Sequence, residues 1–154
     1  MMKNILLAAL AALFLMGCGN ERGSFMLSTT SDQNLTEATK NLENALQKEM
    51  FTLVDTLDHK AVADKYDISI RPQRVVRFTY PQVASTLISC NPSMGMEVPF
   101  KILVWNDYSG KTHIEYLNPE YWSLTHNIKD KKCLELINQT KIAMDKAVGS
   151  VSAE

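Results

Sequence analysis

The sequence predicts an α+β domain in which one largely antiparallel sheet carries helices packed on it. Three observations predict it. Strand-like and helix-like segments alternate along the 154 residues, and a turn-forming segment at 106–110 joins two adjacent strand-like segments as a hairpin. No internal repeat, low-complexity block or second domain interrupts the pattern. This order of elements is typical of a single compact domain.

The N-terminal part of the domain predicts a strand, a helix and a second strand. Residues 25–29 begin with apolar side chains and form the first strand. Asn34 is a good helix N-cap with Glu37 three residues later, and the helix that follows places its apolar residues on one face. Residues 51–55 alternate apolar and polar side chains and are rich in strand formers. The helix face comprises Leu35, Ala38, Leu42, Ala45 and Leu46.

The middle of the chain predicts a short helix, a strong strand and another helix. Residues 59–66 suggest one or two helical turns, and residues 74–80 are β-branched and aromatic. Pro81 stops that strand and suits the first position of a helix running to about Ser89. That helix is expected to bury Val83, Leu87 and Ile88. The 91–99 segment contains two prolines and a glycine, so we expect an irregular loop.

The C-terminal part predicts a hairpin followed by helices. Residues 100–105 are nearly all apolar, which indicates a central strand, and residues 111–117 return as its partner. Residues 119–125 are expected to hold a short helical segment. The last helix starts near Asp130 and ends at Gly149. Its predicted buried face comprises Cys133, Leu136, Ile137, Thr140, Met144 and Ala147.

The N-terminal sequence predicts where in the cell the protein is located. Lys3 precedes an apolar run over 5–16, which suits a secretory signal and is too short to span a bilayer. The run ends in Leu-Met-Gly-Cys at 15–18, which resembles a bacterial lipoprotein lipobox. The resemblance implies a signal peptide at 1–17 and acylation of Cys18. We expect a polar tether at 18–24 and a single domain at 25–149 after it. Gly19 favours the outer membrane, facing the periplasm.

The charge balance excludes some partners. The formal net charge is −1, and removal of Lys3 with the signal peptide makes the mature chain slightly more acidic. A nucleic-acid partner would require a basic face, so we expect none. No polybasic segment is present either, and contact with the membrane is therefore expected through the lipid anchor.

Cys90 and Cys133 remain once Cys18 is acylated, in a compartment that permits disulfides. The two could pair, or each could be buried separately as a small apolar side chain. Nothing in the sequence fixes their separation in space. The second interpretation is favoured.

Sulfur ligands gather at Cys90, Met94 and Met96. Soft sulfur donors select Cu(I), and in a strand or loop the two methionines would point to the same side. Methionine also fills irregular gaps in a core, and this packing interpretation is favoured. The histidines at 59, 113 and 126 show no metal-ligand spacing, and no Cys-x-x-Cys-His motif for covalent haem occurs. A copper- or haem-binding envelope redox protein is kept as the alternative function.

Sequence signatures of catalysis are absent. No Gly-x-Ser-x-Gly elbow or glycine-rich phosphate loop occurs, so an enzyme is the less expected outcome. Asp58 next to His59 could orient an imidazole, although an aspartate at a strand end is also an ordinary helix cap. A hydrolase or transferase would need a nucleophile and a base that converge in the fold.

One part of the chain resembles a known family. The segment Phe-Thr-Tyr-Pro at 78–81, the segment Val-Pro-Phe-Lys-Ile-Leu-Val-Trp at 98–105, and Tyr-Leu-Asn-Pro at 116–119 after the Gly110 turn are similar to motifs of the domain of unknown function 302. The similarity extends over about 25–148. Asp58 to Ala61 resembles the family's aspartate-histidine-alanine element. The resemblance implies a compact α+β domain that pairs as a homodimer, and it implies no agreed enzymatic activity.

The sequence departs from that family at two motifs. Thr79 and Tyr80 replace a glycine-asparagine pair before Pro81, and Glu97 opens a variant of an aspartate-leucine-proline-leucine element. We therefore expect a small-ligand binding or interaction module. The predicted pocket lies beside the 90–99 loop and includes Asp58, His59, Tyr80, Pro81 and Glu97.

Overall fold

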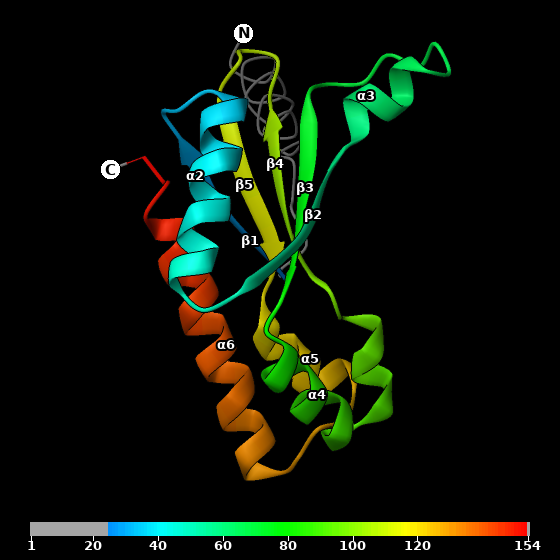
Figure 1. Ribbon diagram of the computed structural model, residues 1–154, viewed down its shortest axis with the longest axis vertical. Helices are drawn as coiled ribbons and strands as arrows, with labels where there is room; N and C mark the ends of the chain where they lie inside the picture. Colours follow the sequence, from blue (N-terminus) through cyan, green and yellow to red (C-terminus); the bar gives the residue numbers. More distant parts are fainter. Residues whose placement is uncertain (1–24, 154) are drawn as a thin grey trace, which may run out of the picture.

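The computed structural model describes residues 25–153 and shows one antiparallel sheet of five strands in the order β1-β5-β4-β3-β2 (Figure 1). The strands are β1 (Met26–Ser31), β2 (Thr52–Asp58), β3 (Gln73–Thr79), β4 (Phe100–Asn106) and β5 (Thr112–Leu117). Strands β2 to β5 follow one another as a meander, and β1 adds to the free side of β5. The predicted α+β class with an antiparallel sheet is confirmed.

Two long helices cover one face of the sheet. Helices α2 (Leu35–Lys48) and α6 (Lys131–Gly149) lie side by side along it (Figure 1). As expected, α2 begins after Asn34, whose side chain accepts the Glu37 N–H, and α6 begins after Asp130. Strand residues that face these helices are almost completely buried, whereas alternate residues face the other side. The buried strand residues are Ser31, Val76, Phe78, Phe100, Ile102, Val104, Thr112, Ile114 and Tyr116.

Shorter helices gather at the two ends of the sheet. Helix α4 (Pro81–Cys90), the 3₁₀ helices η2 (Pro92–Met96) and η3 (Pro119–Tyr121), and α5 (Trp122–Thr125) lie at the lower end in Figure 1. Helix α3 (His59–Asp64) and the loop after it project at the opposite end. Because η2 occupies 92–96, the segment at 91–99 is more regular than the predicted irregular loop. Helix α4 buries Leu87 as expected, together with Ala84, whereas Ile88 is 36% exposed.

The open face is our name for the sheet face opposite α2 and α6. It is lined by alternate strand residues, among them Gln73, Val75, Leu103, Trp105 and Glu115. Strands β4 and β5 are paired only from Leu103–Glu115 to Asn106–Thr112, so their lower ends separate. Below Leu103, β4 stays paired with β3, and β5 stays paired with β1. This separation opens the sheet beside the open face.

Candidate functional site

The predicted pocket residues lie at opposite ends of the sheet. Asp58 caps α3 by accepting the Ala61 N–H at 2.9 Å, and it pairs with Arg74 at 3.0 Å. The Ala61 N–H and then Arg74 lower the pKa of Asp58, although partial burial opposes them. Tyr80 and Pro81 begin α4, six residues beyond Arg74 along β3, which is about 20 Å in a strand.

His59 is the first residue of α3 and therefore lies at the same end of the sheet as Asp58. The prediction of a single pocket around Asp58, His59, Tyr80 and Pro81 is therefore wrong. Asp58 acts as a helix cap, which the sequence analysis gave as the alternative.

Glu97 belongs to a buried hydrogen-bond cluster at the lower end of the fold. Its Oε1 lies 3.0 Å from His126 Nε2, and His126 Nδ1 lies 2.7 Å from Ser93 Oγ. Asn91 donates from its side-chain amide to the His126 carbonyl at 2.7 Å. A hydroxyl, an imidazole and a carboxylate do converge here, but the His126 side chain is only 4% exposed. The cluster holds η2 against α5, which suits a structural role.

The three candidate sulfur ligands do not assemble a metal site. Cys90 forms a disulfide with Cys133, so it offers no thiolate. Met94 is fully buried, whereas Met96 is 77% exposed, because the 3₁₀ helix points them in different directions. The expectation that they share a side, and the favoured expectation of unpaired cysteines, are both wrong. In the described part of the chain, no three His, Cys, Asp or Glu side chains group around a potential metal position.

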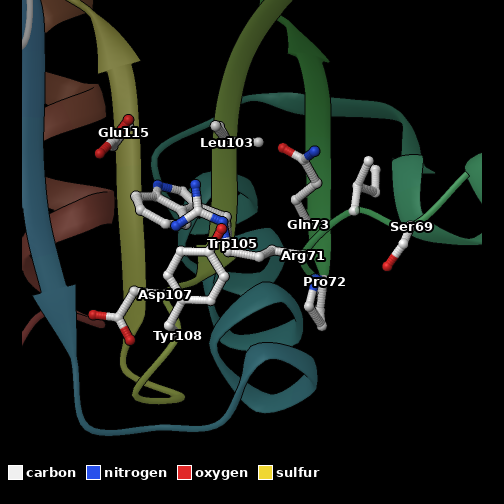
Figure 2. A pocket seen from close by; sticks show the side chains of 10 residues that line it. Ser69, Arg71, Pro72, Gln73, Leu103, Trp105, Asp107, Tyr108 and Glu115 are labelled. Carbon is white, nitrogen blue, oxygen red and sulfur yellow. The ribbon is translucent and has the colours of Figure 1, made fainter.

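The outer cleft is our name for a hollow of about 830 Å³ on the open face. It lies between the segment 69–73, which leads from α3 into β3, and the ends of β4 and β5. The Asn106 N–H donates to the Pro72 carbonyl at 3.0 Å and fixes that segment against β4. The volume of the outer cleft falls in the range of small-ligand sites. The lining comprises Ser69, Ile70, Arg71, Pro72, Gln73, Leu103, Trp105, Asp107, Tyr108 and Glu115 (Figure 2).

Arg71 lies on two aromatic rings in this cleft. Its guanidinium carbon is 4.6 Å from the centre of the Trp105 ring and 4.8 Å from that of Tyr108. Figure 2 shows the three side chains together, with Glu115 and Asp107 farther out. Both distances suit cation–π attraction, which holds the cation in place without using its N–H donors. Among residues 25–153, Arg71 makes no hydrogen bond or ion pair.

Asp107, by contrast, is fully engaged. Its Oδ1 accepts the backbone N–H groups of Ser109 and Lys111 and the Ser109 hydroxyl, which shapes the β4–β5 turn. Its Oδ2 lies 2.9 Å from His113 Nε2. The His113 hydrogen bond, followed by that from the Ser109 side chain, holds the pKa of Asp107 well below its usual range. The turn also directs Tyr108, which is 93% exposed, toward Arg71.

Two buried ring nitrogens lie in the same layer of side chains. His113 stacks on Trp105 with ring centres 4.5 Å apart. Trp105 Nε1 and His113 Nδ1 are shielded from water, and neither has a hydrogen-bond partner in the described residues. An unpaired buried donor or acceptor costs about 1–3 kcal/mol.

The sequence interpretation missed this cleft. Arg71 lies in a loop between two elements, and Tyr108 lies in a turn, where both side chains look like ordinary solvated residues. The available signal was the alternation of 103, 105, 113 and 115 on one strand face, with an aromatic ring among charged and polar residues. Only the fold brings Arg71 onto Trp105.

Comparison with known proteins identifies a family and a fold. A family model described as "Domain of unknown function DUF302" matches residues 27–151. The crystal structure of an uncharacterised conserved DUF302 protein from Bacillus stearothermophilus superposes with a TM-score of 0.76 and 18% identity, covering 84% of this chain and 99% of that one. At that identity the likeness shows the fold alone.

Curated relatives match a smaller segment. A protein named fluoride-specific ion channel FluC 1 from Brucella suis is 26% identical over 72 residues, which covers 47% of this chain and 28% of that protein. FluC 2 from Brucella melitensis matches with the same identity over 27% of its length. The chain thus spans less than a third of the curated relatives. Among the residues the structure describes, no helix has the length and apolar character needed to cross a bilayer.

Proposed function

The chain belongs to the DUF302 family, and because that family has no assigned function, we propose from the geometry of the outer cleft that the protein binds a small anionic ligand there. One observation carries the proposal. Arg71 is held on Trp105 and Tyr108, and its N–H groups find no hydrogen-bond acceptor in the part of the chain that the structure describes, although two carboxylates line the same cleft. A guanidinium that is held in place without a bound anion is ready to bind one.

The partners of the neighbouring acids favour an anion over a cation as ligand. Both oxygens of Asp107 are occupied by the turn and by His113. Glu115 accepts a hydrogen bond from the Ser28 hydroxyl at 3.3 Å. The unused charged donor is the Arg71 guanidinium, whose planar fork suits a carboxylate or phosphate. The exposed aromatic surface beside it suits a flat or apolar ligand body.

The experiment is a titration of the purified protein with benzoate, using benzyl alcohol as the uncharged control. We expect chemical-shift changes at the Trp105 indole, which lines the cleft, with benzyl alcohol binding at least tenfold more weakly than benzoate. Arg71→Gln should weaken benzoate binding at least tenfold. Arg77→Gln is the matched control, because Arg77 lies on the same sheet face but is paired with Asp55. Benzoate binding that survives Arg71→Gln would overturn the proposal.

We further propose that this module works at the cell envelope, anchored through Cys18 and facing the periplasm from the outer membrane. Cys18 and the signal peptide lie outside the described residues. The Cys90–Cys133 disulfide supports this location, because disulfides persist in the periplasm and are rare in a reducing cytosol. An anchored binding domain would hold its ligand close to the membrane.

The expected homodimer is also a proposal. Val62, Tyr66 and Ile68 on α3 and its following loop are 40%, 72% and 55% exposed. They belong to the segment that projects from the sheet in Figure 1. A projecting apolar patch of this kind suits contact with a second copy of the chain. That contact would leave α2 and α6 free on the far face of the sheet.

A further inference from the structure

A second hollow adjoins the outer cleft where β4 and β5 separate. This tail cavity, as we call it, has a volume of about 200 Å³ and leads from the open face toward the core. Its walls are mainly apolar and include side chains from both faces of the sheet. Among the apolar wall residues are Val75, Phe100, Leu103, Leu117, Trp122 and Met144.

The two hollows share part of their lining. Leu103 and Glu115, the last pair of the β4–β5 ladder, border both the outer cleft and the tail cavity. Trp105 marks the cleft end, and Lys101, four residues earlier on β4, borders the cavity end. Four residues of a strand span about 13 Å. One ligand could therefore occupy both hollows.

We propose that the ligand is an amphiphilic carboxylate with a medium-length alkyl tail. The inference rests on the proposed function, since the carboxylate is the anion held by Arg71. The tail passes over Leu103 and enters the opening between β4 and β5. Burial of alkyl carbons against apolar walls then adds to the affinity that the charged end supplies.

The charged groups around the tail cavity fit this orientation. Glu97 is engaged by His126 at 3.0 Å, and Glu115 accepts from Ser28, so neither acid lacks a partner. Glu97 borders the tail cavity and not the outer cleft, so its repulsion of a carboxylate favours an uncharged tail on this side. Lys101 is exposed and has no ion pair among residues 25–153. Among the described residues that line the tail cavity, Lys101 is the cation that competes with Arg71 for the anionic end, and the experiment separates the two positions.

The test measures binding of butyrate, hexanoate and octanoate by calorimetry, with benzoate as a tail-free reference. We expect affinity to rise about fourfold for each added methylene until the cavity is full, because a buried methylene contributes about 0.8 kcal/mol. Leu117→Trp should remove this chain-length dependence and leave benzoate unchanged, because Leu117 is 53% exposed and borders only the tail cavity. Arg71→Gln should weaken all four ligands by a similar factor.

Different outcomes separate the two proposals. Benzoate that binds through Arg71, with no gain from longer chains or no effect of Leu117→Trp, would overturn the tail inference and keep the proposed function. A chain-length effect that Lys101→Gln abolishes and Arg71→Gln does not would overturn the assignment of the carboxylate to Arg71. The absence of any benzoate binding would overturn the proposed function itself.

Discussion

Cys90 and Cys133 form a disulfide that joins the last residue of α4 to the first turn of α6, with their Cα atoms 6.3 Å apart. The bond ties the lower end of the fold to the long helix that covers the sheet. Cys90 also precedes Asn91, which caps η2 and donates to the His126 carbonyl. The disulfide and the buried histidine cluster therefore fasten the same corner of the molecule.

We expect removal of this disulfide to lower the free energy of unfolding by about 2–4 kcal/mol. The bond closes a loop over a sequence separation of 43 residues, and the chain-entropy model for that length gives a value near the top of this range. Urea denaturation of the protein with and without dithiothreitol measures the effect. The Cys90→Ala/Cys133→Ala double variant is the control and should not respond to the reductant. Equal stability of the oxidised and reduced proteins would contradict the prediction.

Acid is expected to destabilise the fold partly through Asp107. The pKa of its carboxyl is lowered in the folded protein, chiefly by the His113 hydrogen bond, relative to about 3.9 in an unfolded chain. A lowered folded-state pKa contributes stability above the unfolded value, and this stability is lost as the pH falls toward the folded value. The urea midpoint of the wild type should therefore drop between pH 7 and pH 3, and that of Asp107→Asn should drop less.

A matched variant isolates this effect. Asp67 has a positive φ of 55°, which asparagine also tolerates, and its carboxylate makes no hydrogen bond among the described residues. Asp67→Asn should keep the full pH dependence of the wild type. If Asp107→Asn and Asp67→Asn show the same drop as the wild type, the Asp107–His113 contact does not contribute.

Local patterns were sufficient to predict most elements of this fold. Asn34, Asp130 and Pro81 start helices where their capping or backbone preferences place them, and the 106–110 segment turns the hairpin as its composition indicates. These signals act over a few residues, so sequence reasoning reaches them. The regular η2 turn at 92–96 was missed because prolines and a glycine suggest a loop, whereas the Asn91 cap and burial of Met94 stabilise a 3₁₀ helix.

The site could not be predicted in the same way because its contacts are long-range. We expected Asp58 and Tyr80 to be neighbours because each belongs to a family-like motif at the end of a strand. Strands β2 and β3 are antiparallel, however, so their ends, and these two residues, lie at opposite ends of the sheet. Arg71 meets Trp105 and Tyr108 only after β3 pairs with β4 and the hairpin turn closes. The Cys90–Cys133 pairing likewise depends on how α4 packs on α6.

The projecting apolar segment should mediate self-association. We expect the wild-type protein to sediment as a dimer, and Ile68→Lys to weaken the dimer at least tenfold, because it places a charge in a buried apolar contact. Ile142→Lys on α6 is the control, since Ile142 is exposed to the same degree, 56% against 55% for Ile68, but lies on the helical side. A monomeric wild type, or equal disruption by both variants, would contradict this arrangement.

We expect Cys18 to be acylated, and this prediction tests the proposed location of the protein in the outer membrane. The chain expressed in a bacterial host with a labelled fatty acid should incorporate label and fractionate with the outer membrane. Cys18→Ala should lose the label and leave the membrane fraction, because one thiol carries the anchor and no polybasic segment replaces it. Folding of the domain should be unchanged, and benzoate titration of the Cys18→Ala protein checks it. Label retained by Cys18→Ala would contradict the lipoprotein assignment, whereas label lost with membrane association retained would indicate a different mode of attachment.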